Sequence, residues 1–337
     1  MGSVVCHSGG ILEYRRLGRA GMKVSALGLG CNSFGSWLDE KTTERVVHYA
    51  LDRGINFFDT SNRYSGGLSE EFLGKALKGR HSAVVIATKF GAAAKYTSVG
   101  VQGPNDSGGS RYHIMGVVEG SLRRLQTDHI DLYQMHLPDP TTPIEETLRT
   151  LDDLVHAGKV RYIGCSNFMP DQVCQAMETS ETLKLEPFVT AQEQYNLIDR
   201  GIEKELVPCY RTYGLGLIPY RPLRLGFLTG KYKRGKGLPP GSRFDGKQDR
   251  MKREAGEDFL SERSFDILER LETFAKGNGH TVGELAIAWL LSHPWVSSVI
   301  AGSVLPEQIE ANLKATEWKL TPEELALVNQ MTSMKEL

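Results

Sequence analysis

Short apolar segments that alternate with longer helical segments are the feature that most limits how this chain can fold. Eight segments have apolar and β-branched middles, which are typical of strands buried on both faces. We predict strands over 24–30, 55–61, 83–91, 130–136, 160–167, 188–196, 215–223 and 297–303. We predict helices over 42–54, 69–79, 116–126, 143–159, 170–180, 203–214 and 305–315.

This alternation predicts an α/β fold, and the number of strands favours a closed (β/α)8 TIM barrel. An open doubly wound sheet is the alternative. The opening "ILEYRRLGRAGMKVSALG" predicts an N-terminal β-hairpin that turns at "GRAG". No linker or low-complexity tract interrupts the chain, so we expect one domain over 1–337, with residues 1–10 flexible.

Long loops are expected at the carboxyl ends of the strands. The segment 231–259 is charged and rich in Gly and Pro, and a loop of this length in a compact domain is usually a lid or a binding loop.

A partial dinucleotide-binding motif occurs near the start of the chain. The sequence "GLGCNSFG" (28–35) follows a predicted strand, but Ser33 stands where the third glycine is required. No acidic residue ends a second strand about 20 residues further on. These differences disfavour a Rossmann domain.

Composition excludes several classes of function. The net charge is −1, which gives no support for nucleic-acid binding, and no apolar run approaches the ~20 residues of a membrane helix. The N-terminus lacks the features of a signal peptide, and Cys6 stands where myristoylation requires Ser or Thr. We therefore expect a cytoplasmic protein without nucleic-acid or membrane partners. Nothing in the sequence indicates an oligomeric state.

Cysteine spacing indicates neither a metal site nor a disulfide framework. The five cysteines form no Cys-x-x-Cys pair, and we expect no bound metal. Cys31 and Cys165 fall in or beside predicted strands, so we expect buried, inert thiols.

Ionisable side chains stand at or just beyond three consecutive strand ends. Asp59 ends the second strand, with Tyr64 in the following loop, while Lys89 and His136 end the next two strands. In a βα barrel these ends converge on one face. The alternative is a structural Asp59–Lys89 ion pair with the other two side chains uninvolved.

This set of groups suits proton donation to a carbonyl. Tyrosine has a pKa near 10, and a nearby ammonium such as Lys89 should lower it. Asp59 can orient Lys89, and a neutral His136 can hydrogen-bond the substrate oxygen. Since no side chain donates a hydride, such a site implies a nicotinamide cofactor.

Several motifs resemble the aldo-keto reductase family over essentially the whole chain. They are "GINFFDTSNRYSGGLSEEFLGKAL", "IDLYQMHLPD", "GKVRYIGCSNF", "QEQYN" and "FLTGKY". The resemblance implies a (β/α)8 barrel, a catalytic set of Asp59, Tyr64, Lys89 and His136 with Tyr64 as the general acid, and NAD(P)H bound without a Rossmann fold. The bacterial and potassium-channel-β-subunit-like branch is the most similar.

The resemblance also implies cofactor-binding residues. Ser166, Asn167 and Gln192 would hold the nicotinamide carboxamide, and Tyr220 would stack on its ring. Residues expected at the phosphates are Leu223, Gly226, Lys231 and Arg243. Residues expected at the adenosine phosphate are Gly302, Ser303, Gln308 and Asn312, and the remaining cofactor residues are Gly30 and Asn32.

Two departures from the family pattern concern cofactor choice. The sequence "YRPLRLG" adds Arg221 and Arg224, and Val304 and Leu305 stand where relatives often have a cation for the 2′-phosphate. We expect NADP(H) to be favoured over NAD(H), with the 2′-phosphate held from the loop after the seventh strand.

The leading prediction is a reversible NADP(H)-dependent reductase of aldehydes and ketones. The alternatives are an NAD-dependent sugar or alcohol dehydrogenase and a regulatory protein that binds nucleotide and senses redox state. Loops 92–113 and 224–259 and the C-terminal tail should select the substrate. Trp37, Tyr96 and Phe168 are candidate pocket residues, and packing within the loops is the alternative for each.

Overall fold

The computed structural model describes residues 4–7, 10–92, 103–246, 248–256 and 258–332. Its barrel strands are β4 (Leu27–Gly30), β5 (Phe57–Asp59), β6 (Val85–Phe90), β7 (Ile130–Met135), β8 (Val160–Ser166), β9 (Thr190–Gln194), β10 (Gly216–Tyr220) and β11 (Val299–Gly302). Its helices are α1 (Glu40–Asp52), α2 (Leu68–Ala76), α3 (Arg111–Leu125), α4 (Ile144–His156), α5 (Pro170–Leu183), α6 (Leu206–Tyr213), α7 (Gln248–Ala255), α8 (Glu262–Gly277), α9 (Val282–Leu291), α10 (Pro306–Lys314) and α11 (Pro322–Thr332).

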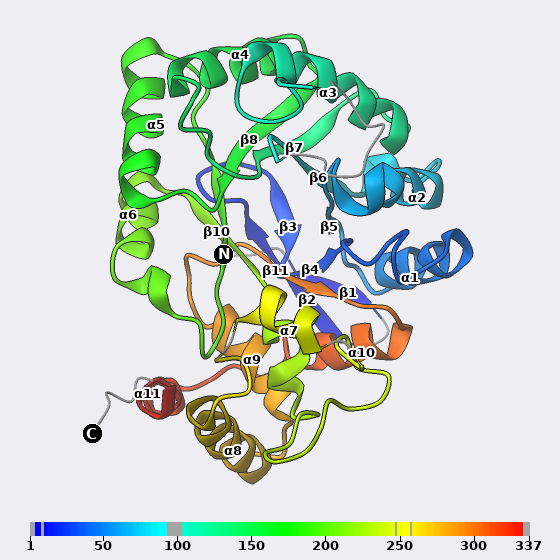
Figure 1. The fold of residues 1–337 in the computed structure, drawn as a ribbon, viewed down its shortest axis with the longest axis vertical. Helices are drawn as coiled ribbons and strands as arrows, with labels where there is room; N and C mark the ends of the chain where they lie inside the picture. The colour runs from blue at the N-terminus through cyan, green and yellow to red at the C-terminus, as the bar shows by residue number, and fades with distance from the viewer. Residues whose placement is uncertain (1–3, 8–9, 93–102, 247, 257, 333–337) are drawn as a thin grey trace.

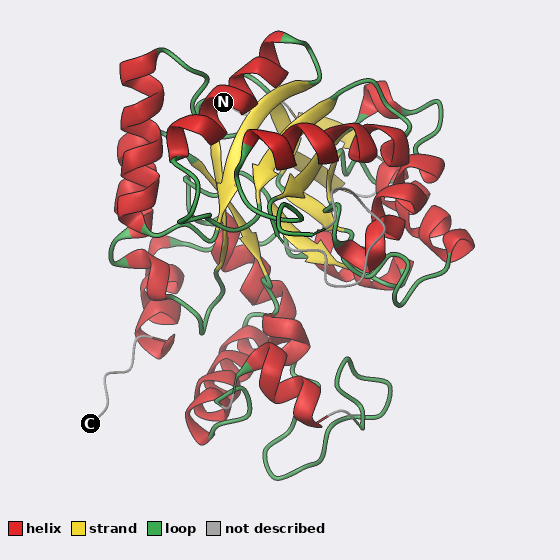
Figure 2. Cartoon of the chain, turned by 45° about the horizontal axis from the view of Figure 1, so that its top comes forward, coloured by secondary structure: helices red, strands yellow, loops and turns green. Residues whose placement is uncertain are grey.

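The eight strands form one parallel sheet that curls into a nearly closed barrel. Their order is β10-β9-β8-β7-β6-β5-β4-β11, and helices surround the strands on the outside (Figures 1 and 2). The remaining gap is bridged where Leu217 N donates to Trp295 O (2.8 Å) and Ser297 N donates to Leu217 O (2.9 Å). The predicted (β/α)8 barrel is confirmed.

The N-terminal strands cover the end of the barrel at which the barrel strands begin. They are β1 (Val4–His7), β2 (Gly10–Arg16) and β3 (Lys23–Ser25), paired antiparallel in that order. Leu17 and Val24 pack into the same apolar cluster as Phe57 and Ile218 of the barrel interior. The hairpin is confirmed and gains a third strand at Val4–His7, while flexibility of residues 1–10 stays a prediction.

Helix α1 packs on the outside of the barrel because it presents one apolar face. In α1, Val46, Val47 and Ala50 are buried against the sheet. The Asp39 carboxylate accepts a hydrogen bond from Thr42 N at 2.8 Å, which caps the helix start. The chain then turns at Gly54, whose φ of 83° suits glycine. The predicted segment 42–54 is thus a helix shifted by about two residues, within ordinary boundary error.

Four helices lie outside the predicted set. Helix α7 falls within 231–259, so the segment predicted as a loop is helical at Gln248–Ala255. Helices α8, α9 and α11 follow. In α9 the signal was present, because Thr281 and Glu284 form a reciprocal capping box.

Candidate active site

A cavity of about 680 Å³ opens at the carboxyl ends of the barrel strands. Asp59 ends β5, Tyr220 ends β10 and Gly302 ends β11, and all three line the cavity. The predicted site residues that line it are Gly30, Asn32, Asp59, Tyr64, His136, Ser166, Asn167, Gln192, Tyr220, Arg221, Leu223, Gly226, Lys231, Arg243, Gly302, Gln308 and Asn312. Its volume falls within the ~300–1,000 Å³ range of small-molecule sites.

A buried ion pair lies beneath the floor of the cavity. Lys89 Nζ donates to Asp59 Oδ1 at 2.6 Å and to the Thr60 carbonyl at 2.8 Å. The other Asp59 oxygen accepts from Gln192 Nε2 at 2.8 Å and from Gln134 Nε2 at 3.2 Å. Burial by itself lowers the pKa of Lys89. The Asp59 carboxylate and Tyr64 raise this pKa by more than burial lowers it, so the pKa of Lys89 is raised overall. Lys89 is therefore a charged ammonium held in one orientation.

Tyr64 lies between this ammonium and His136. Lys89 Nζ lies 5.2 Å from the centre of the Tyr64 ring, and the His136 ring meets it edge-on with centroids 5.9 Å apart. Burial raises the pKa of Tyr64 by more than Lys89 lowers it, so its pKa is raised overall. The expected lowering of this pKa is therefore wrong, and Tyr64 is a neutral phenol that can donate a proton.

His136 follows β7 and is neutral, as predicted. Burial, together with the positive charges of Lys89 and Arg63, holds its pKa well below the usual range. Its Nδ1 lies 3.2 Å from Ser61 Oγ, which fixes the orientation of the ring.

Polar side chains from three strand ends form one wall of the cavity. Asn167 has a φ of 61°, and its Nδ2 donates to Ser166 Oγ at 2.9 Å and to the His136 carbonyl at 3.0 Å. Tyr220 OH donates to Asn167 Oδ1 at 2.7 Å. Ser166 Oγ donates to the Gln192 carbonyl at 2.8 Å. The wall is thus ordered by hydrogen bonds within the protein.

Cations gather where the chain leaves β10. Lys231 and Arg243 line the cavity, and Lys231 is exposed to solvent there. Partial burial of its ammonium and the nearby Arg243 lower the pKa of Lys231. Gly226 has a φ of 92°, and a Cβ there would lie 2.8 Å from Lys231 Nζ. The absence of a side chain at Gly226 therefore leaves room for the Lys231 ammonium.

Arg224 does not reach the cavity, which corrects the prediction that it binds cofactor. Its Nη1 donates to Ser264 Oγ at 2.8 Å and to the Phe259 carbonyl at 3.2 Å, and only 4% of the residue is exposed. Arg224 and Leu225 have φ values of 44° and 54°, which turn the side chain toward the start of α8. Arg221 stays at the cavity, where its Nη1 donates to Gln194 Oε1 at 3.0 Å.

The β11 end supplies the remaining predicted residues. Gln308 Oε1 accepts from Val304 N at 2.7 Å, which ties α10 to the strand end. Ser303 does not line the cavity, but its Oγ accepts from Asn312 Nδ2 at 3.4 Å. A Cβ added at Gly302 would lie 3.5 Å from Asn32 Oδ1, in ordinary van der Waals contact with that side chain.

Sequence reasoning missed two charged residues. Arg63 lines the cavity beside Tyr64, and its position directly before that tyrosine was the available signal. Glu193 is buried, and its carboxylate accepts from Tyr210 OH at 3.2 Å and from the backbone N–H groups of Asn167 and Phe168. Burial raises the pKa of Glu193 to about 7.

The three candidate pocket residues differ in where they lie relative to the cavity. Trp37 lines the cavity, whereas Phe168 is buried and packs edge-on against Phe188, which agrees with the packing alternative for Phe168. Tyr96 lies outside the described residues. Cys31 and Cys165 are fully buried, as predicted.

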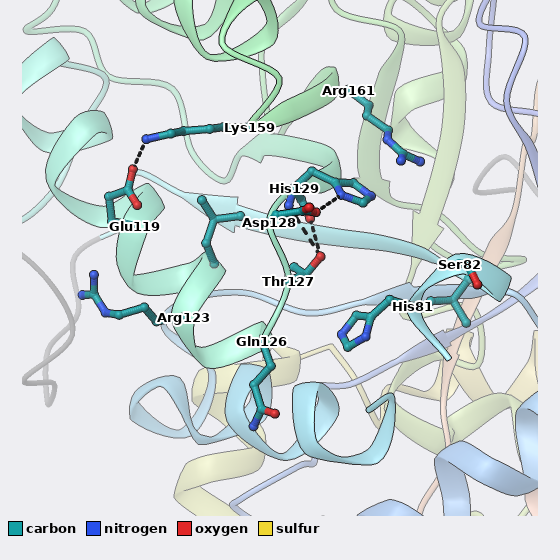
Figure 3. A pocket seen from close by; sticks show the side chains of 12 residues that line it. His81, Ser82, Glu119, Arg123, Gln126, Thr127, Asp128, His129, Lys159 and Arg161 are labelled. Carbon is teal, nitrogen blue, oxygen red and sulfur yellow. Dashed lines mark hydrogen bonds and ion pairs between the residues drawn. The ribbon is translucent and has the colours of Figure 1, made fainter. Parts of the chain in front are cut away.

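A second hollow of about 910 Å³ lies at the opposite end of the barrel, where β6, β7 and β8 begin (Figure 3). Lys159 forms an ion pair with Glu119, and His129 Nδ1 lies within hydrogen-bond distance of the Asp128 carboxylate, so these groups already have partners there. Catalytic groups of βα barrels lie at the carboxyl ends of the strands. The 680 Å³ cavity is therefore the candidate active site.

Neither a metal-binding cluster nor a membrane-spanning helix is found among the residues that the structure describes. No group of three or more His, Cys, Asp or Glu side chains there is placed to hold a metal ion. None of the helices there has both the length and the apolar character that crossing a bilayer requires.

Comparison with known proteins agrees with this geometry. A "Probable voltage-gated potassium channel subunit beta" of Oryza sativa subsp. japonica is 38% identical over 333 residues, covering 96% of this chain and 98% of the relative. "Uncharacterized oxidoreductase YrpG" of Bacillus subtilis is 39% identical over 329 residues, covering 95% and 96%. "Aldo-keto reductase YhdN" of the same species is 34% identical over 325 residues, covering 94% and 93%. Residues 26–333 match the aldo/keto reductase family, and the chain belongs to that family.

Proposed function

We propose that this protein reduces aldehydes or ketones with NADPH and that Tyr64 is the general acid. NAD(P)H-dependent oxidoreduction of carbonyls is the chemistry of the family. One observation supports the finer assignment: Tyr64, His136 and the Asp59–Lys89 pair meet at the cavity whose lining also includes Lys231 and Arg243.

The cavity fits a dinucleotide in its donor set. Lys231 has no acidic partner among the described side chains, and Arg243 repels it, so an anionic group placed between them would be stabilised. Ser166 and Asn167 would hold the carboxamide, and the Tyr220 ring would contact the nicotinamide. A nicotinamide bound there supplies the hydride, which no side chain can donate.

The side chains of the protein supply the proton that the carbonyl oxygen receives. The Tyr64 hydroxyl donates its proton to the carbonyl oxygen, leaving a phenolate. The Lys89 ammonium stabilises this phenolate, and Asp59 keeps the ammonium in place. Neutral His136 offers a hydrogen bond that orients the carbonyl oxygen.

Cofactor preference depends on where the 2′-phosphate binds. Val304 and Leu305 provide no cation at the start of α10, and Arg224 is bonded elsewhere. We propose that Lys231, Arg243 and Arg221 hold this phosphate and that NADPH is preferred. The test is kcat/KM for NADPH and for NADH with one aldehyde, and a clear preference for NADH would refute the assignment.

A regulatory nucleotide-binding protein is the second candidate, because relatives carry the name of potassium-channel β subunits. The deciding experiment measures nucleotide binding and NADPH oxidation with 4-nitrobenzaldehyde, methylglyoxal and a wider carbonyl panel. Turnover supports the reductase. Tight binding of NADPH without reduction of any carbonyl would favour the regulatory protein instead. Oxidation of aldoses by NAD⁺ in the same assay would indicate a sugar dehydrogenase.

A further inference from the structure

The cavity is positively charged although the whole chain has a net charge of −1. The charged side chains that line it in the described part of the chain are Asp59, Arg63, Arg221, Lys231 and Arg243. Asp59, the one carboxylate in this described lining, is already bonded to Lys89. A cleft lined by charges of one sign concentrates ligands of the opposite sign.

Three of these cations are accounted for by a dinucleotide, and Arg63 is not. Arg221, Lys231 and Arg243 belong to the chain that follows β10. Arg63 follows β5 instead and directly precedes Tyr64.

Arg63 is placed to act at the reacting end of the cavity. Its charge lies close enough to act on both Tyr64 and His136. Its side chain is exposed, and no acidic side chain among the described residues pairs with it. A guanidinium in this setting is available for a carboxylate or phosphate, which it can bind with two parallel hydrogen bonds.

Apolar side chains complete this part of the lining. Trp37 and Leu137 line the cavity and are 43% and 42% exposed. Leu137 directly follows His136 in the chain. Such surfaces suit the carbon body of a substrate, with Arg63 available for a charged end.

We propose that the preferred substrates are aldehydes or ketones that carry an anionic group, either a carboxylate or a phosphate, and that Arg63 binds this group. The inference rests on the proposed reductase function. Arg63 is then a specificity-determining residue, which the carbonyl chemistry itself does not require.

The test uses matched substrates that differ in one charged group. For the carboxylate, kcat/KM is measured for 4-carboxybenzaldehyde and for its neutral methyl ester. For the phosphate, it is measured for glyceraldehyde 3-phosphate and for glyceraldehyde. We expect at least one charged substrate to be preferred about tenfold or more, which corresponds to ~1.4 kcal/mol.

Variants then assign the preference to one residue. Arg63→Gln should reduce the charged-to-neutral ratio about tenfold, mainly through KM, and Arg63→Lys should restore part of it. Arg80→Gln, at an exposed arginine outside the cavity, is the matched control and should keep the wild-type ratio. The binding of NADPH to each variant is measured in parallel.

Three results would overturn the inference. They are equal use of charged and neutral substrates by the wild type, equal loss of both in Arg63→Gln, and weaker NADPH binding in Arg63→Gln with an unchanged substrate ratio. Failure to reduce any aldehyde, charged or neutral, would instead contradict the proposed function itself.

A separate observation concerns two outer helices. Cys174 on α5 and Cys209 on α6 have their sulfur atoms 3.7 Å apart, and both residues are half-buried and unoxidised. Burial, with the hydrogen bond to Cys174, raises the pKa of Cys209 to about 12, so Cys209 keeps its proton. Disulfide formation requires the sulfurs to approach to ~2.05 Å.

We infer that Cys174 and Cys209 form a disulfide when the protein meets a hydroperoxide. The Cys174 thiol attacks a peroxide oxygen and becomes a sulfenic acid, and its proton leaves with the second peroxide oxygen as one water. The Cys209 thiol then attacks the sulfenic sulfur of Cys174, and its proton leaves with the sulfenic hydroxyl as a second water. In total the two thiols lose two protons and two electrons, which reduce hydrogen peroxide to two waters.

Peptide mapping after treatment with hydrogen peroxide tests this inference in a Cys6→Ser background. We expect a cross-linked peptide pair that is lost on reduction and is absent in Cys174→Ser and in Cys209→Ser. Buried Cys31 and Cys165 are internal controls and should stay reduced. Full alkylation of both Cys174 and Cys209 after oxidation, or independent oxidation of each to a sulfinic acid, would refute the pairing.

Discussion

At the scale of single residues, the surroundings of Tyr64 determine its acid strength. Burial raises its pKa by more than Lys89 lowers it. The phenol therefore keeps its proton in the resting protein. Lys89, held by Asp59 at 2.6 Å, stabilises negative charge only once the proton has left. This is the behaviour that a general acid requires.

Removing the Tyr64 hydroxyl tests this role. Tyr64→Phe should lower kcat by roughly 10²–10⁴-fold, since the hydroxyl acts in the transition state, while NADPH binding survives. The measurements are steady-state kinetics and nucleotide titration. Tyr112→Phe, at a 66% exposed tyrosine on α3, is the matched control and should turn over normally. Undiminished kcat in Tyr64→Phe would exclude it as the acid.

Glu193 carries a prediction about stability and pH. Its pKa is raised from 4.5 to about 7 by burial, so the folded state holds a proton that the unfolded state releases between these values. The free energy of unfolding should therefore fall as pH rises from 4.5 to 7, by up to ~3 kcal/mol, and then level off.

Denaturant unfolding of Glu193→Gln from pH 4.5 to 8 checks this slope. Glutamine cannot titrate, so the variant should lose the part of the slope that Glu193 supplies. Glu178→Gln, at an exposed glutamate on α5, should keep the wild-type slope. The same slope in the wild type and in Glu193→Gln would contradict the prediction.

At the scale of elements, the turn after β10 shapes the cation cluster. The short 3₁₀ segment Arg224–Thr229 is kinked in its middle, where Leu225 and Gly226 leave helical geometry with φ values of 54° and 92°. This path turns Arg224 away from the cavity and leaves Lys231 facing it. One turn therefore decides which cations can meet a ligand.

Gly226→Ala tests the importance of this turn. A Cβ would meet Lys231 Nζ at 2.8 Å and would strain a positive φ, so the ammonium must move. We expect NADPH binding to weaken roughly tenfold, the effect of ~1.4 kcal/mol. Gly237→Ala is the matched control, because a Cβ there meets nothing within 4 Å and φ is not positive. Equal NADPH affinities in the two variants would contradict the prediction.

At the scale of the whole molecule, barrel closure concentrates charges that lie far apart in the chain. Arg63 and Arg243 line one cavity although 180 positions separate them in sequence. The net charge of −1 gives no hint of this positive cavity. Charge at a site is thus a property of the fold, which bulk composition does not report.

Salt dependence of ligand stabilisation follows from this distribution. NADPH at about 100 times its Kd should raise the free energy of unfolding by ~2.7 kcal/mol. Raising the salt concentration from about 0.05 to 0.5 M at a fixed NADPH concentration should reduce this increase in the free energy of unfolding, because salt screens partly exposed charges. Thermal unfolding with and without NADPH measures the effect, and uncharged adenosine is the control. A gain that salt leaves unchanged would contradict the prediction.

Much of the fold and the meeting of the candidate catalytic residues was predictable because both depend on local sequence order. All eight barrel strands fall where apolar runs predict them, and parallel strands place their carboxyl ends together. Asp59, Lys89 and His136 therefore converge whatever the loops do. Helices α8 and α9, which were not predicted, carry capping signals in the sequence at Ser261 and at Thr281 and Glu284.

The sequence by itself thus determined the barrel, the family and the groups at its strand ends. Tertiary structure alone decided that Arg224 bonds to Ser264, that Tyr64 has a raised pKa and that Cys174 meets Cys209. The physical reason is that strand order follows from local apolar patterns. Burial, backbone turns and contacts between distant segments depend on how the whole chain packs.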